Sequence, residues 1–130
     1  MINKFTKFTS VVALMLVAII LAGCVNTTSP VNPMRITWDE AAEIMIDGVI
    51  ILDVRTLGEF NAGSITNAIL LPYDEIKYAA PYVIPDKEQT ILLFCRSGRR
   101  SAIAANILAD MGYQNVFDLG GIIDLENGEF

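Results

Sequence analysis

Cys95 is the residue of this sequence best suited to act as a nucleophile. It begins the segment Cys95-Arg96-Ser97-Gly98-Arg99-Arg100, which lies between an apolar run and an alanine-rich run. A cysteine reacts as its thiolate, and a free pKa of about 8.5 leaves little thiolate at neutral pH. The three arginines and the positive end of a following helix would lower that pKa. Gly98 permits a curve that turns backbone N–H groups inward, so the segment is predicted to stabilise an anionic sulfur or a small oxyanion.

The elements predicted around Cys95 alternate between strand and helix. Residues 49–54 and 90–94 are apolar and β-branched runs, typical of strands buried on both faces of a sheet. Together with the predicted helices they indicate one α/β domain, with a largely parallel sheet and helices on both faces. Cys95 would then lie at the carboxyl end of a strand, where such sheets bind ligands. The other predicted elements are a helix from the capping box of Thr37 and Glu40 to about Ile46, helices at 56–61, 74–82 (bounded by Pro81 and Pro85) and 101–111 (capped by Gly112), strands at 68–71 and 115–117, and a turn at Gly120-Gly121.

The N-terminal segment predicts export from the cytoplasm. Two lysines precede an apolar run at 11–21 that ends in Leu21-Ala22-Gly23-Cys24, a pattern typical of a secretory signal peptide. The last four residues resemble a bacterial lipobox, which implies cleavage before Cys24, lipidation of its sulfur and attachment to a membrane outside the cytoplasm. An ordinary signal peptide and a retained anchor are the alternatives. We therefore expect a lipoprotein signal peptide at 1–23, a flexible tether at 24–34 and a globular domain at 35–130.

Charge and composition narrow the range of partners. Without residues 1–23 the chain would keep seven basic and fifteen acidic residues, a net charge of −8. Three of those seven positive charges follow Cys95, which argues against nucleic acid as a partner and favours a small anion. The sequence has no histidine, so Cys–His dyads and histidine-ligated metals are excluded. If Cys24 is lipidated, Cys95 has no disulfide partner in the chain, and a free thiol outside the cytoplasm indicates a function.

Four segments resemble the signatures of the single-domain rhodaneses, a family of sulfurtransferases. The segment from Cys95 to Ser101 matches the active-site loop of that family closely. The four segments occur in the family's order, so residues 35–130 are identified as resembling a rhodanese-like domain. The other three segments are Leu52-Asp53-Val54-Arg55 with Glu59-Phe60, Gly63-Ser64-Ile65-Thr66-Asn67-Ala68, and Met111-Gly112-Tyr113 through Gly120-Gly121-Ile122.

The resemblance implies sulfur transfer through Cys95. The thiol would take a sulfane sulfur from a donor such as thiosulfate, become a persulfide, and pass the sulfur to a thiol or to cyanide. No metal or organic cofactor is implied, because the intermediate is covalent. The residues that would bind the donor and the anionic sulfur are Arg96, Ser97, Gly98, Arg99 and Arg100.

Asp53, Arg55 and Glu59 are candidate supporting residues. Arg55 and Glu59 are four residues apart and could form a solvated pair on the helix predicted at 56–61, worth only about 0.3–0.5 kcal/mol. The resemblance implies instead that they fix the loop beside Cys95, together with Asp53. The sequence departs from the family at Ser64, where histidine is usual, at Thr66-Asn67, where Pro-Gly is usual, and at Leu125, about where tryptophan often lies.

Other functions compete with sulfur transfer. Cysteine phosphatases and arsenate reductases of a related fold use a Cys-x5-Arg loop, whereas this sequence has only Cys-x4-Arg, which ends at Arg100. A persulfide carrier or a redox-sensing binding module would use Cys95 without fast turnover. A purely structural domain would make Cys95 a small apolar filler at the end of a buried strand.

Overall fold

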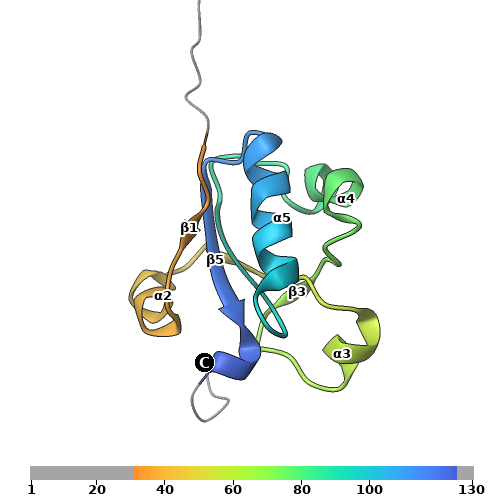
Figure 1. The fold of residues 1–130 in the computed structure, drawn as a ribbon. Helices are drawn as coiled ribbons and strands as arrows, with labels where there is room; N and C mark the ends of the chain where they lie inside the picture. The colour runs from red at the N-terminus through yellow and green to blue at the C-terminus, as the bar shows by residue number, and fades with distance from the viewer. Residues whose placement is uncertain (1–30, 126–130) are drawn as a thin grey trace, which may run out of the picture.

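Five parallel strands form one sheet in the computed structural model, which describes residues 31–125. The strand order is β1-β5-β4-β2-β3, so β4 lies at the centre. Figure 1 shows α4 and α5 on one side of the sheet and α2 on the other, which confirms the predicted α/β class. The strands are β1 (Met34–Arg35), β2 (Ile50–Asp53), β3 (Ile69–Leu70), β4 (Thr90–Cys95) and β5 (Asn115–Gly121), and the helices are α2 (Trp38–Ile44), α3 (Leu57–Asn61), α4 (Ile76–Val83), α5 (Arg99–Asp110) and the short η1 (Ile122–Asp124).

The central strand β4 is apolar because both of its faces are buried. Ile91, Leu93 and Cys95 belong to the hydrophobic cluster under α4 and α5. Leu92 and Phe94 belong to the cluster on the α2 side. Successive side chains of a strand point to opposite faces, so a strand covered on both sides shows no alternation of polar residues.

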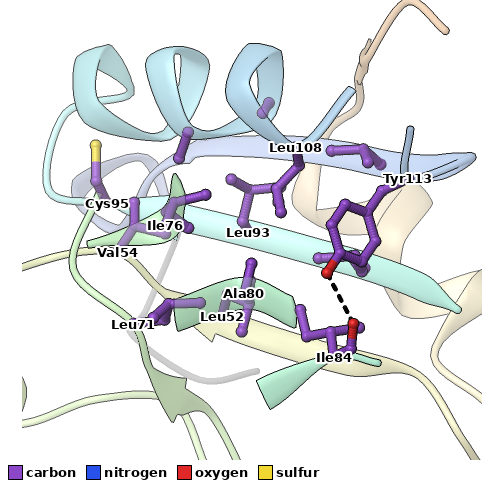
Figure 2. Packing of buried hydrophobic residues seen from close by; sticks show 14 residues of the cluster. Leu52, Val54, Leu71, Ile76, Ala80, Ile84, Leu93, Cys95, Leu108 and Tyr113 are labelled. Carbon is purple, nitrogen blue, oxygen red and sulfur yellow. Dashed lines mark hydrogen bonds between the residues drawn. The ribbon is translucent and has the colours of Figure 1, made fainter. Parts of the chain in front are cut away.

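Cys95 lies at one end of the cluster under α4 and α5. Figure 2 shows its sulfur at that end, and Tyr113 beside Ile84 at the other. The buried Tyr113 hydroxyl donates a hydrogen bond of 2.7 Å to the carbonyl of Ile84. The packing of these side chains therefore holds β4 so that Cys95 lies at the carboxyl edge of the sheet.

Two threonines begin helices through complete capping boxes. Thr37 Oγ1 accepts a hydrogen bond from the N–H of Glu40, and the Glu40 carboxylate accepts one from the N–H of Thr37. Thr56 and Glu59 form the same reciprocal pair at the start of α3. Each box satisfies two backbone donors that a helix start would leave without partners, so the predicted starts at these positions are confirmed.

The helix after Cys95 begins earlier than the prediction of 101–111. Gly98 has a φ of 90° and is the residue before α5, which starts at Arg99. Arg99 and Arg100 therefore belong to the first helical turn, and the connecting turn is only 96–98. At the other end, Gly112 has a φ of 90°, and the N–H of Tyr113 donates to the carbonyl of Leu108, which confirms the predicted glycine cap.

The last strand is longer than predicted. Residues 115–117 were expected to form the strand and Gly120-Gly121 to turn the chain, but β5 continues to Gly121, which pairs with Cys95. The register shifts within this pairing: Leu93 faces Asp118 and Phe94 faces Gly120. The extra residue makes a bulge, which a left-handed glycine at position 120 accommodates.

Two further boundaries differ from the prediction. Pro81 was expected to bound the helix predicted at 74–82, yet it lies inside α4. It is in the last turn, so the missing N–H removes one backbone hydrogen bond and the helix ends two residues later. Met34, expected in the tether, pairs with Phe117 in the sheet.

The predicted signal peptide, Cys24 and the tether up to residue 30 lie outside the described residues. Within residues 31–125, no helix combines the length and the apolar character that crossing a membrane requires.

Candidate active site

Cys95 is the last residue of the buried strand β4, and 1% of its surface is exposed. It is a free thiol. The turn 96–98 leads from it directly to Arg99 at the start of α5. The sulfur therefore lies where a strand ends and a helix begins, and the helix dipole favours an anion at that end.

Backbone N–H groups surround the sulfur. The N–H of Gly98 donates a hydrogen bond of 3.1 Å to Cys95 Sγ. Burial acts to raise the pKa of the Cys95 thiol, but the N–H groups of Ser101, Ser97 and Gly98 and the Ser101 hydroxyl outweigh it. The pKa of Cys95 is consequently lowered from its ordinary value, because these donors stabilise the thiolate more than the thiol.

Ser101 connects the sulfur to the end of β5. Its buried hydroxyl lies 3.8 Å from Cys95 Sγ. The same oxygen lies 3.0 Å from the carbonyl of Gly98 and 3.3 Å from that of Gly120, to which its proton can be donated. Ser101 was expected only as part of the Cys95 segment, whereas the structure places it among the groups that touch the sulfur.

The three arginines near Cys95 have different environments. Arg96 and Arg99 are exposed. Both guanidinium amino groups of Arg100 contact the Glu59 carboxylate at 2.7 Å. Glu59 is the largest cause of the raised pKa of Arg100, and the Cys95 sulfur adds to it. Arg96 and Arg99 are therefore the arginines of this segment that face solvent, while Arg100 is fixed beside the sulfur.

The solvated pair of Arg55 with Glu59 is not formed. Thr56 is the N-cap of α3, so Arg55 precedes the helix and does not share a helical face with Glu59. Glu59 contacts Arg100 instead, and this contact, opposed by burial and assisted by Thr56, lowers the pKa of Glu59. Glu59 thus joins α3 to the first turn of α5, next to Cys95.

Asp53, the last residue of β2, and Arg55 form a buried charge pair. Arg55 Nη2 lies 2.6 Å from Asp53 Oδ2, and Arg55 Nε lies 2.9 Å from Oδ1. Arg55 also donates to the carbonyl of Gly63, and Ser64 Oγ donates to Asp53 Oδ2 at 2.7 Å. The hydrogen bond with Asp53 raises the pKa of Arg55 despite its burial. Ser64, noted as a departure from the family pattern, thus completes the coordination of this carboxylate.

A second charge pair, which the sequence analysis missed, lies on the other side of the Cys95 turn. Arg35 Nη1 lies 3.0 Å from Asp118 Oδ2, across 83 positions of the sequence. Gly121 also lies close to the turn after Cys95, because a Cβ on Gly121 would be 2.8 Å from the Arg96 carbonyl oxygen. No local spacing could predict these contacts, and the only signal was the pair of glycines itself.

Leu125 lies away from Cys95. It packs against the cluster on the α2 side and lines a cavity of about 770 Å3 with Arg35, Trp38 and Asp124, among others. Cys95 does not line this cavity. The departure at Leu125 therefore affects the α2 side of the sheet. Among residues 31–125 no cluster of three or more His, Cys, Asp or Glu could hold a metal ion.

The chain is similar to known sulfurtransferases. Thiosulfate sulfurtransferase PspE of Escherichia coli (strain K12) is 35% identical over 57% of this chain and 71% of that protein. Thiosulfate sulfurtransferase GlpE of Tolumonas auensis is 31% identical over 67% of this chain and 81% of that protein. A solved structure, described as a rhodanese with anions from E. coli, is 34% identical, has a TM-score of 0.56 and covers 59% of this chain and 91% of its own.

Residues 37–124 match the family described as the rhodanese-like domain. This range includes strands β2 to β5, Cys95 and the turn that follows it. The match therefore covers the fold and the candidate active site together, and two sulfurtransferases are matched over more than two thirds of their length. The chain belongs to the rhodanese-like domain family.

Proposed function

We propose that this protein is a sulfurtransferase that carries a sulfane sulfur on Cys95. The observation that carries the proposal is a free, buried thiol whose sulfur accepts backbone hydrogen bonds in a rhodanese-like domain. These donors favour the thiolate, which is the nucleophilic form of cysteine. The same donors suit a persulfide, because its outer sulfur is also anionic.

The proposed reaction has two steps. The Cys95 thiolate attacks the outer sulfur of thiosulfate, the S–S bond of the donor breaks, and sulfite leaves with the electron pair. The acceptor, cyanide or a thiolate, then attacks the outer sulfur of the Cys95 persulfide. That S–S bond breaks, the Cys95 thiolate is regenerated, and thiocyanate or an acceptor persulfide departs. No metal or organic cofactor takes part, since the sulfur is held covalently and no external oxidant or reductant is consumed.

Charged side chains divide the remaining work. Arg96 and Arg99 are exposed and attract the anionic donor to an otherwise acidic protein. Arg100 is held by Glu59 close to the sulfur and stabilises negative charge that develops there during transfer. Asp53 and Arg55 hold the chain after β2 through the Gly63 carbonyl and the Ser64 hydroxyl.

A persulfide carrier without fast turnover is the second candidate. It is favoured by the burial of Cys95, of which 1% is exposed, because a bulky acceptor could not reach the sulfur directly. A carrier would load one sulfur per chain and release it only to a fitting partner. A redox-sensing role would need the same thiol to react with oxidants instead.

Turnover with thiosulfate and cyanide separates these functions. The full chain should form thiocyanate over many turnovers, and Cys95→Ser should abolish it while the protein stays folded. One equivalent of thiocyanate per chain would support the carrier. Unchanged activity in Cys95→Ser would show that the thiol is not involved.

We also propose that Cys24 carries a lipid and holds the domain to a membrane outside the cytoplasm. Leu21-Ala22-Gly23-Cys24 supports this proposal. In bacterial cells, Cys24→Ser should prevent lipidation. The protein should then either appear in the soluble fraction or keep its uncleaved signal peptide. An unchanged mass and location in that variant would contradict the lipid anchor.

A further inference from the structure

Arg35, the last residue of β1, lies against two glycines at the site. A Cβ atom on Gly120 would overlap Nη2 and Cζ of Arg35, and a Cβ on Gly98 would lie 3.3 Å from Nη1. Both glycines have positive φ angles, 90° at Gly98 and 82° at Gly120. At Gly120 the guanidinium therefore occupies space that exists only because that residue has no side chain, whereas at Gly98 a Cβ would make a tight contact with it.

Asp118 fixes the position of this guanidinium. Its Oδ2 lies 3.0 Å from Arg35 Nη1, and its Oδ1 accepts a hydrogen bond of 2.9 Å from the N–H of Gly120. The Asp118 side chain is 8% exposed, against 55% for that of Arg35. One buried carboxylate thus holds both the guanidinium and the glycine that it covers, so Arg35 is oriented at its charged end.

Both glycines that contact Arg35 are connected to Cys95 through hydrogen bonds, Gly98 directly and Gly120 through Ser101. The N–H of Gly98 donates directly to Cys95 Sγ at 3.1 Å. The carbonyl of Gly120 lies 3.3 Å from the Ser101 hydroxyl, which itself lies 3.8 Å from Sγ. A shift of Gly98 would therefore move a donor to the Cys95 sulfur, and a shift of Gly120 would change how the Ser101 hydroxyl is held beside that sulfur.

We propose that Arg35 is a positioning residue, which holds Gly98 and Gly120 in place so that the Gly98 N–H and the Ser101 hydroxyl face Cys95. The planar guanidinium suits this role, because it can lie flat against two backbone segments while it donates to Asp118. Arg35 acts through these glycines, whereas Arg96 and Arg99 are placed to meet the donor. The inference rests on the proposed function for its kinetic consequence, but its effect on the thiol is independent of sulfur transfer.

The test compares Arg35→Gln and Arg35→Lys with the unchanged chain. The rate at which iodoacetamide alkylates Cys95 is measured against pH, at the level of the Cys95 peptide so that Cys24 does not contribute. We expect both variants to react about threefold more slowly below the midpoint of the thiol titration, which corresponds to about half a pKa unit. The kcat for thiosulfate and cyanide should fall by a similar factor while the KM for thiosulfate stays unchanged.

Two further variants make this test specific. Asp118→Asn keeps the Arg35 side chain but removes the charge that holds its guanidinium. This variant should also slow alkylation, by less than the Arg35 variants do. Lys77→Gln removes one positive charge from the exposed surface of α4 and should leave the alkylation profile unchanged.

Each opposing result overturns a stated part of the proposal. An alkylation profile in both Arg35 variants equal to that of the unchanged chain, with a lower melting temperature, would make Arg35 merely structural. A raised KM with unchanged kcat would make it a donor-binding residue. Full recovery in Arg35→Lys would replace positioning by charge alone. If the unchanged chain transfers no sulfur while the Arg35 variants still react slowly, the proposed function fails and the positioning role stands.

Discussion

β2 and β4 are neighbouring parallel strands that end in different ways. β2 ends at Asp53, whose buried carboxylate is neutralised by Arg55 and also accepts a hydrogen bond from Ser64. β4 ends at Cys95, whose sulfur accepts a backbone N–H, while the Arg100 guanidinium that interacts with this sulfur is paired with Glu59. The first strand end has a fixed charge with its own counterion. The end of β4 has hydrogen-bond donors that suit an anion, and the ionisable thiol of Cys95 can become that anion.

This difference separates a structural site from a reactive one. A carboxylate in a complete buried ion pair is not available to bind a ligand, and breaking the pair leaves an uncompensated charge. A thiol held among N–H donors can lose its proton and can bear an added sulfur without a new counterion. Asp53 should therefore dominate stability, and Cys95 should dominate reactivity.

The largest expected effect on stability comes from Asp53→Asn. This change leaves the buried guanidinium of Arg55 without its counterion, which should lower the free energy of unfolding by about 3–5 kcal/mol. Urea denaturation followed by the fluorescence of Trp38, the single tryptophan, measures this. Ser64→Ala removes only a neutral donor to the same carboxylate and should cost about 1 kcal/mol. Equal losses in the two variants would contradict the importance of the charge pair.

Gly98→Ala should weaken both stability and reactivity at the Cys95 side. Its φ of 90° is strained for any residue with a Cβ, at a cost of about 1–2 kcal/mol. The N–H that donates to Cys95 would shift, so alkylation of the thiol should also slow. Gly58→Ala in α3 is the control, since a Cβ there meets no atom within 4 Å and alanine favours a helix. Wild-type alkylation in Gly98→Ala would show that this donor is dispensable.

The Glu59–Arg100 pair predicts a pH dependence of stability. The folded-state pKa of Glu59 lies below its ordinary value of 4.5, so its contribution is complete above that pH and is lost as the pH falls towards the folded-state pKa. Glu59→Gln should cost about 1 kcal/mol at pH 7 and should flatten the acid side of the stability profile. Parallel profiles for the two proteins between pH 6 and pH 3, taken as about the range in which Glu titrates, would rule out this contribution.

The smallest expected effect is that of Ser101→Ala on the thiol. Its hydroxyl is one of several groups that lower the pKa of Cys95, and the backbone donors remain after the change. The alkylation rate below the titration midpoint should fall about twofold, which corresponds to a rise of about 0.3 in the pKa of Cys95. Ser97→Ala should leave it unchanged, because Ser97 contributes its N–H. A larger effect of Ser97→Ala would reverse the assignment of these donors.

Local sequence patterns were sufficient for β2, β3 and β4 and for the starts of α2 and α3, whereas β1 was not predicted and β5 is longer than predicted. The capping box of Thr37 lies within four residues of sequence, and the apolar run before Cys95 forms the predicted buried strand. The position of Cys95 at the end of that strand followed from the same run. The capping box of Thr56 is equally local, although the sequence analysis predicted only the helix that it begins. The sequence predicts Gly98 as a turn residue but not as the N-cap of α5, because Arg99 and Arg100 are predicted to lie in the turn.

Contacts between distant residues could not be predicted from spacing. Arg100 and Glu59 are 41 positions apart, and Arg35 and Asp118 are 83 positions apart. The four-residue spacing of Arg55 and Glu59 suggested a helical pair that the N-cap at Thr56 prevents. The pairing of each arginine depends on which strand ends meet at the edge of the sheet, and this is decided by topology.

The mass of the Cys95 peptide after treatment with thiosulfate tests the central proposal most directly. The full chain is incubated with thiosulfate, digested without reductant and compared with an untreated sample. We predict a gain of one sulfur atom on the Cys95 peptide, which cyanide then removes as thiocyanate, and no gain in Cys95→Ser. A Cys95 peptide of unchanged mass in a folded protein would contradict the persulfide intermediate.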